Sequence, residues 1–374
     1  MIFPLLAALL FTLATFVVAA LLGLGLWFAR ARQRRYWRTV AWLHLALFPT
    51  HLFVTFPVVL GWLGSRVFVG TRPDERSYAG PRLDVEGRLL VQSWDSLRAE
   101  RQSGAPSAPA DVVAAAKARE RRIPSRDGVS LRAFRIESRL PTPRAVVVLV
   151  HGLFRSAMEL EPVASMLHEQ GCECWLVELR NFGGSSRAPF TLGLRESDDV
   201  LAAVAHVRAE PGRERTPLVL FGVSFGTVAI ALALPQLQGV AGVVLDAPID
   251  DMLPAARRLF GVIAERRPMF GVGEPWQSLT LRSLEAWSGI ELATMCPADV
   301  LATLPPDLPM LVVGAGIDER APPATVERLF VRLPMPAEQK RLWMVGESSH
   351  GQVFLDQPAA YAEHLRWLLE RLRR

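Results

Sequence analysis

The sequence predicts an α/β domain with a doubly wound, mostly parallel sheet, preceded by two transmembrane helices. Three observations support this prediction. Short apolar runs alternate with helical segments from residue 123 to the C-terminus, a glycine-flanked serine joins one such run to a helix, and two long stretches near the N-terminus carry no charged side chain. Regular strand–helix alternation is typical of a parallel sheet that is covered by helices on both faces.

The N-terminal region is apolar enough to cross a membrane. The chain as a whole is 50% hydrophobic with a mean hydropathy of +0.22, and residues 1–29 and 39–65 contain no charged side chain. Each stretch exceeds the ~20 residues that a membrane-spanning helix needs. A signal peptide fits the first stretch poorly, because no basic segment precedes it and its apolar run is too long. We therefore expect a hairpin over residues 1–66, with spans at about 2–28 and 39–65.

The short loop between the two spans suggests an orientation. Residues 30–38 include five arginines, and basic loops of this kind remain in the cytoplasm. The rest of the chain then lies on the periplasmic or outer side of a membrane, which we expect to be a bacterial inner membrane. Because further arginines follow the second span, a domain that faces the cytoplasm is the alternative. His44 and His51 lie within the second span, where packing is a commoner role for histidine than proton relay.

Residues 67–122 are expected to connect the hairpin to the globular domain. A charged stretch punctuated by glycine and proline comes first, and a short amphipathic helix is predicted over 89–101. Residues 102–110 have the composition of a linker. A further helix is predicted over 112–122 because its last turn is basic, as the helix dipole favours.

The globular domain is expected to span residues 123–374. Apolar runs predict its strands, at 131–136, 145–150, 174–177, 218–221, 240–245, 310–313 and 341–345. Helices are predicted between them at 158–169, 197–209 and 324–333. Residues 247–308 contain no clear strand and are rich in Trp, Phe and Met, so we expect a lid there. Those side chains suit an acyl or other apolar substrate, and packing within the lid explains them equally well.

The chain is organised around the turn Gly222-Val223-Ser224-Phe225-Gly226, which joins an apolar strand to an apolar helix. Glycines two residues before and after a serine relieve the crowding of a sharp strand-to-helix turn. The turn exposes the Ser224 hydroxyl and places the N–H of Phe225 where it faces a developing oxyanion. A plain glycine–serine turn is the alternative reading of the motif.

The partners that an attacking serine needs all follow predicted strands. His350 comes directly after the last strand and is the candidate base, and Asp318, after the strand at 310–313, is the candidate acid. Asp246 is the alternative acid, and Glu319 is a weaker one. The loop after the strand at 145–150 offers the N–H of Leu153 as a second oxyanion donor, with Phe154 as the alternative and His151 shaping the loop. In open α/β sheets, ligands bind outside the carboxyl ends of the strands, where all of these residues are expected to lie.

Taken together, these segments resemble the α/β-hydrolase superfamily, in particular its lipase, esterase and serine aminopeptidase-like members. The resemblance covers about residues 123–374 and rests on His151-Gly152, the segment 178–186, the Ser224 turn, Gly316-Ile317-Asp318 and Ser349-His350-Gly351. It implies an eight-stranded, mostly parallel sheet, a lid after the sixth strand, an acyl-enzyme mechanism, and no cofactor or metal. The segment 178–186 departs mildly from the family pattern, with Glu178 first and Asn181 in place of a glycine.

The sequence therefore predicts a membrane-tethered serine hydrolase acting on carboxylic esters, lipophilic or lipid esters included. Peptidase, thioesterase and acyltransferase chemistry on the same triad are alternatives, as is a non-catalytic binding module with a hydrolase-like domain. The net charge of +5 is scattered, and no basic stripe interleaved with aromatics indicates nucleic acid. Three cysteines do not settle the compartment.

Overall fold

The computed structural model describes residues 10–15, 17, 33–67, 119–153, 155–266 and 274–372. The chain divides into two compact units. One contains Met1–Phe68 with Ala256–Glu291, and the other contains Val69–Ala255 with Leu292–Arg374. The helices predicted over 89–101 and over most of 112–122 lie outside the described residues, as does most of the first predicted span.

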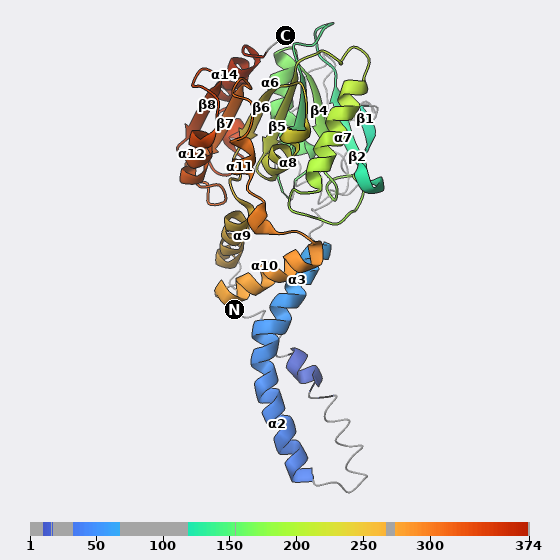
Figure 1. Cartoon of the computed structure of the whole chain (residues 1–374), viewed down its shortest axis with the longest axis vertical. Coiled ribbons are helices and arrows are strands. Elements are labelled where there is room, and N and C mark those ends of the chain that lie inside the picture. Colours follow the sequence, from blue (N-terminus) through green and yellow to red (C-terminus); the bar gives the residue numbers. More distant parts are fainter. Residues whose placement is uncertain are drawn as a thin grey trace. The chain divides into compact units, whose positions relative to one another are not determined.

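The larger unit is built on one eight-stranded sheet (Figure 1). Its strands follow the order β1-β2-β4-β3-β5-β6-β7-β8. Strand β2 runs antiparallel to β1 and β4, and the remaining neighbours are parallel. The mostly parallel sheet predicted from the sequence is thereby confirmed. The strands are β1 Glu120–Pro124, β2 Ser130–Ile136, β3 Val146–Val150, β4 Glu173–Val177, β5 Leu218–Val223, β6 Val240–Asp246, β7 Met310–Ala315 and β8 Lys340–Val345.

Helices cover the sheet on both faces because its central strands are buried throughout and almost entirely apolar. Every residue of β3, β4, β5 and β7 is buried. One face packs against α6 and α14 in a continuous apolar core, while α7 and α8 contact each other. The α-helices of this unit are α6 Glu161–Glu169, α7 Glu196–Ala209, α8 Phe225–Ala233, α11 Pro297–Leu301, α12 Pro323–Arg332, α13 Val353–Asp356 and α14 Pro358–Leu369. Short 3₁₀ turns are η2 Arg126–Gly128, η3 Ala157–Leu160, η4 Leu234–Gln236 and η6 Leu292–Thr294.

The first strand corrects the sequence analysis. We predicted a helix through residue 122, whereas β1 begins at Glu120 and pairs with β2 in the register Ile123 to Leu131. Ile123 is the one fully buried side chain of the strand, and the three residues before it are charged. Charged side chains are typical of edge strands. The arginines that resembled the end of a helix therefore belong to the sheet edge.

The smaller unit contains a long apolar helical stretch. Helix α2 (Gln33–Thr50), the π-helical turn η1 (His51–Thr55) and helix α3 (Phe56–Val67) follow one another directly. Among the described residues, this stretch holds one helix, Arg38–Leu63, that is long and apolar enough to cross a membrane. The predicted loop over 30–38 is helical from Gln33 onward. The two-span hairpin stays a prediction.

The insertion, which we define as residues 247–308 between β6 and β7, is helical where it is described. It contains α9 (Met252–Arg266), α10 (Glu274–Ser288) and α11. Its two ends are held together within the larger unit, because the N–H of Met252 donates to Met295 O and the N–H of Ala298 donates to Asp250 O, each at 3.0 Å. The part from Ala256 to Glu291 groups with the N-terminal helices.

Candidate active site

Ser224 lies in a strained turn between β5 and α8. Its backbone has φ 51° and ψ −115°, a conformation that residues other than glycine rarely adopt. A Cβ atom at Gly226 would lie 2.3 Å from the carbonyl oxygen of Val150, and one at Gly222 would lie 2.8 Å from the carbonyl carbon of Gly226. Both glycines are therefore required by close packing. The turn itself is fixed by a hydrogen bond of 2.8 Å from the N–H of Ser224 to the carbonyl of Asp246.

The structure brings Ser224, His350 and Asp318 into one hydrogen-bonded row. His350 Nε2 lies 2.6 Å from Ser224 Oγ, and His350 Nδ1 lies 2.7 Å from Asp318 Oδ2. The imidazole side chain is 13% exposed and the Asp318 side chain is fully buried. One nitrogen of the ring thus faces the hydroxyl while the other faces the carboxylate.

Asp318 is held in place by the backbone of its own loop. Its Oδ1 accepts the N–H groups of Arg320 and Ala321 at 2.8 and 2.9 Å, which leaves Oδ2 directed at His350. The loops after β7 and β8 are also joined, because the N–H of Ile317 donates to Ser348 O at 3.1 Å. The separation between the carboxylate and the imidazole is therefore set by main-chain contacts.

Asp246, the alternative acid, has a different partner. It is fully buried at the end of β6, and its Oδ2 accepts the hydroxyl of Tyr361 at 2.7 Å. Its Oδ1 has no hydrogen-bond partner within the described part of the chain. Burial raises the pKa of Asp246 to about 7, and the nearby carboxyls of Glu159 and Asp318 act in the same direction. Glu319, the weaker candidate, is solvent-exposed.

The loop after β3 is fixed around the peptide bond that follows Gly152. The carbonyl of Gly152 lies 2.8 Å from Nδ1 of His151, whose Nε2 accepts the N–H of Leu179 at 3.3 Å. The proton therefore sits on Nδ1, which donates to the carbonyl. Burial lowers the pKa of His151 to about 4 and keeps the ring neutral. Because a trans peptide is planar, the N–H of Leu153 points opposite to that carbonyl. Phe154 lies outside the described residues.

The sequence analysis missed Glu159, which holds the other side of Gly152. Its Oε2 accepts the N–H of Gly152 at 2.7 Å, and a Cβ atom at Gly152 would lie 3.5 Å from Ser224 Cβ. Burial raises the pKa of Glu159 to about 7, although Arg155 and Arg320 oppose the change. Glu159 stands at the start of the helix predicted over 158–169, a few residues after Gly152, and this nearness in sequence was the available signal. Glu159 positions the loop that carries Leu153.

The candidate site combines a hydroxyl, an imidazole and a carboxylate with backbone N–H donors, the groups that acyl transfer uses. The first N–H groups of a helix have no intrahelical acceptor, so the N–H of Phe225 at the start of α8 is available beside Ser224. No group of three or more His, Cys, Asp or Glu side chains suited to a metal ion occurs in the described ranges.

Comparison with known proteins agrees with this architecture. The model of the alpha/beta hydrolase family matches residues 147–364, more than half of the chain. The chain belongs to the alpha/beta hydrolase family. It is also 25% identical over 237 residues to the uncharacterized protein YfhR of Escherichia coli O157:H7, an alignment that covers 62% of this chain and 73% of that protein.

Solved structures of esterases share the fold. The esterase Pf2001 of Pyrococcus furiosus matches with a TM-score of 0.54 at 17% identity, covering 68% of this chain and 92% of that one. The alpha/beta hydrolase GrgF of Penicillium matches with a TM-score of 0.52 at 18% identity, covering 68% and 98%. At these identities the likeness shows the fold. The chain is thus a hydrolase by family, with esterase-like structural neighbours.

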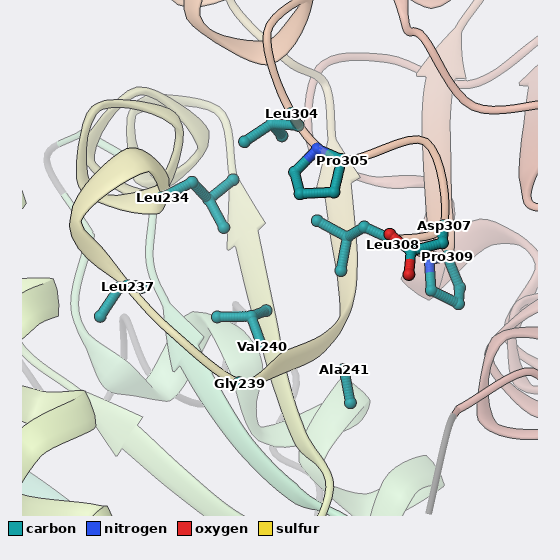
Figure 2. Close-up of a pocket in the computed structure, with 10 residues that line it drawn as sticks. All are labelled: Leu234, Leu237, Gly239, Val240, Ala241, Leu304, Pro305, Asp307, Leu308 and Pro309. Atoms are coloured by element: carbon teal, nitrogen blue, oxygen red, sulfur yellow. The ribbon is translucent and has the colours of Figure 1, made fainter.

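Figure 2 shows a hollow that none of the residues of the candidate site lines. It is formed around the amino ends of β6 and β7, whereas Ser224, Asp318 and His350 follow the carboxyl ends of strands. It is lined by Leu234, Leu237, Gly239, Val240, Ala241, Leu304, Pro305, Asp307, Leu308 and Pro309. In a parallel sheet these two edges lie at opposite ends of the strands, so this hollow is distinct from the candidate site.

Proposed function

We propose that the chain is a membrane-anchored serine hydrolase that cleaves carboxylic esters through an acyl-enzyme. The observation that carries this proposal is the row Asp318–His350–Ser224, with hydrogen-bond distances of 2.7 and 2.6 Å. Asp318 fixes the tautomer of His350 and stabilises its charged form, and His350 takes the Ser224 proton. Esters are the preferred substrates because the structural neighbours include named esterases, which is support by analogy.

In the first half of the reaction, Ser224 Oγ attacks the carbonyl carbon of the ester as its proton passes to His350 Nε2. The carbonyl π electrons move to oxygen, and the N–H groups of Phe225 and Leu153 stabilise the resulting oxyanion. Such donors act strongly because they are oriented before the reaction and shielded from water. When the tetrahedral intermediate collapses, the C–O bond to the leaving alkoxide breaks, and His350 returns the proton to it.

The second half repeats the chemistry with water as the nucleophile. Water gives a proton to His350 Nε2 and attacks the acyl carbon, and the bond to Ser224 Oγ breaks as the proton returns to the serine. The carboxylic acid then leaves. Every proton in both halves passes through His350, so the imidazole must stay between the hydroxyl and Asp318.

We extend the proposal to the membrane on the basis of hydropathy. The helix Arg38–Leu63 has a mean hydropathy of 1.7 in its apolar window, and five arginines lie among residues 30–38. Two spans, with the hydrolase domain on the periplasmic or outer side, fit the positive-inside rule. Cysteines introduced among residues 30–38 should resist a membrane-impermeant reagent in intact cells. Labelling from outside would contradict this orientation.

The test of the chemistry is labelling with a fluorophosphonate, which reacts with activated serines. The full-length protein should be labelled, whereas Ser224→Ala and His350→Ala should not. Ser349→Ala is the matched control, because Ser349 is exposed beside His350, while the imidazole bonds to Asp318 and Ser224 instead. Labelling that survives in Ser224→Ala would overturn the proposed nucleophile.

A graded substrate series separates the remaining chemistries. Short and long acyl esters, the matching thioesters and the matching amides should rank with esters first. A preference for amides or thioesters would leave the proposed triad in place and change the class of substrate. A folded protein that is neither labelled nor able to cleave short soluble esters would favour the binding module.

A further inference from the structure

Helix α10 of the insertion packs directly against α3, as Figure 1 shows. At the crossing, a Cβ atom on Gly61 would lie 2.5 Å from the carbonyl oxygen of Thr280 and 2.6 Å from Ser283 Cβ. Thr280 and Ser283 are themselves buried. Small residues that let two backbones approach this closely are typical of helix pairs in membranes. The contact therefore depends on Gly61 having no side chain.

A second contact supplies a hydrogen bond that the apolar helix cannot make within its own backbone. In the π-helical turn, the N–H of Phe56 donates to His51 O, five residues earlier. The next donor in this pattern would serve Leu52 O, but residue 57 is proline and has no N–H. Trp276 of α10 supplies the missing donor, since its Nε1 lies 3.1 Å from Leu52 O. Inside a bilayer, neighbouring helices commonly satisfy carbonyls that a proline frees.

Two more contacts bring polar and aromatic groups of α10 onto the same helix. Ser283 Oγ donates to Val58 O at 2.7 Å, and the ring centroids of Trp276 and Phe56 lie 5.7 Å apart. Trp276 is only 2% exposed. Trp276, Thr280 and Ser283 are spaced four and three residues apart, so one face of α10 meets the apolar helix.

Large apolar and aromatic side chains are exposed along α2, η1 and α3 and at the end of α10. The exposed large side chains are Trp42, Leu43, Phe53, Val54, Trp62, Leu63 and Trp287. Large apolar side chains that are exposed along a helix long enough to span a bilayer indicate lipid contact. Helix α10 has 15 residues, or about 22 Å at 1.5 Å per residue, and contains Glu274, Arg282 and Glu285. It is too short and too polar to span, and its length suits the membrane interface.

We propose that α10 is a membrane-interface helix docked on the apolar helix formed by α2, η1 and α3, and that this docking lets the hydrolase act on esters dissolved in the bilayer. The inference rests on the proposed function and adds the substrate class. The insertion begins directly after Asp246, the last residue of β6, whose carbonyl accepts the N–H of Ser224. A docked α10 therefore belongs to a segment that starts, in sequence, at the carboxyl end of the sheet, where Ser224 also lies.

The experiment uses the full-length protein in vesicles of phosphatidylcholine and phosphatidylglycerol. Gly61→Leu places a side chain into the crossing of α10 and α3. Trp276→Phe keeps an aromatic ring but removes the indole N–H that donates to Leu52 O. Gly261→Leu is the matched control, because a Cβ atom at Gly261, on α9 of the same insertion, meets nothing within 4 Å. Two readouts are taken, limited proteolysis of residues 256–291 and the ratio of hydrolysis of a long-chain ester in the vesicles to that of a soluble short-chain ester.

We expect Gly61→Leu to speed cleavage of the insertion and to lower the ratio of long-chain to short-chain hydrolysis about tenfold or more, since docking is lost. Trp276→Phe should change both in the same direction by a smaller factor, and Gly261→Leu should match the parent. If neither variant alters proteolysis, the docking is overturned. If proteolysis changes while the ratio does not, bilayer esters are excluded as the reason for docking.

The two proposals fail separately in this design. Proteolysis needs no catalysis, so it tests the docking even if no ester is cleaved. Loss of fluorophosphonate labelling in the parent protein would overturn the proposed hydrolase, and with it the assigned substrate class, while the proteolysis result for α10 would stand.

Discussion

Strand β6 ends in a buried aspartate, Asp246, and the loop after β7 carries another, Asp318. The two differ in the hydrogen bonds that their carboxylate oxygens accept. Asp318 receives two backbone N–H groups on one oxygen and His350 on the other. Asp246 receives only the hydroxyl of Tyr361, and its second oxygen is unpartnered among the described residues. A buried charge is tolerated where hydrogen bonds and an adjacent base compensate its desolvation. The comparison shows that partners, rather than residue type or burial, suit Asp318 to orient a histidine.

The largest expected effect separates the two aspartates by the same substitution. Asp318→Asn should lower kcat on a soluble ester about 10⁴-fold, because the amide no longer fixes the productive tautomer of His350. Asp246→Asn should lower kcat about tenfold or less, since its side chain bonds Tyr361. Steady-state kinetics on both purified proteins measures the difference. Equal losses in the two variants would show that the acid is shared.

The second expected effect concerns the pH dependence of stability. The pKa of Asp246 is about 7 in the folded protein and near 3.8 when exposed, so its contribution to stability is full below about pH 4 and is lost as pH rises to about 7. An asparagine at position 246 does not ionise, so the variant does not lose this stability as pH rises. The stability of the variant relative to the parent should therefore rise between pH 4 and 7, by up to about 4 kcal/mol, and level off above.

Chemical denaturation of both proteins at pH 4, 5.5, 7 and 8.5 provides the measurement. The asparagine NH₂ lacks an acceptor at the site of Oδ1, which adds a constant cost of about 1–3 kcal/mol that does not vary with pH. The slope with pH, rather than the absolute stability, is thus the informative quantity. A relative stability that falls as pH rises would contradict the raised pKa of Asp246.

The smallest expected effect tests Glu159 as a positioning residue. Glu159→Ala leaves the N–H of Gly152 without an acceptor, so kcat should fall about 10- to 100-fold with little change in KM, as the Leu153 donor moves. Glu159→Gln keeps an acceptor oxygen and should recover most of the rate. A loss in Glu159→Ala that appears in stability alone, with kcat intact, would limit Glu159 to a structural role.

Much of the larger unit could be predicted because its signals are local. Runs such as residues 145–150 and 218–221 are too short and too apolar for surface helices, and they match β3 and β5 closely. The turn at Ser224 is recognisable in the sequence because a glycine stands two residues before it and two residues after it. The chain order serine, aspartate, histidine, each after a predicted strand, then indicates which side chains the fold brings together.

The features that escaped prediction depend on contacts between distant segments. Strand β1 is defined by its pairing with β2, and its arginines resemble a helix end until the partner strand is present. Glu159 is informative only because Gly152 lies beside it in space. Likewise, the bond from Trp276 to Leu52 O joins residues far apart in sequence, and no local pattern contains it.

The most direct test of the proposed hydrolase is to find where the acyl group resides during turnover. The full-length protein is mixed with an activated short-chain ester, quenched in acid within one turnover, digested and analysed by mass spectrometry. We expect an acyl adduct on the peptide that contains Ser224 and none in Ser224→Ala. Continued hydrolysis by Ser224→Ala, or an adduct on another residue of the parent protein, would contradict this expectation.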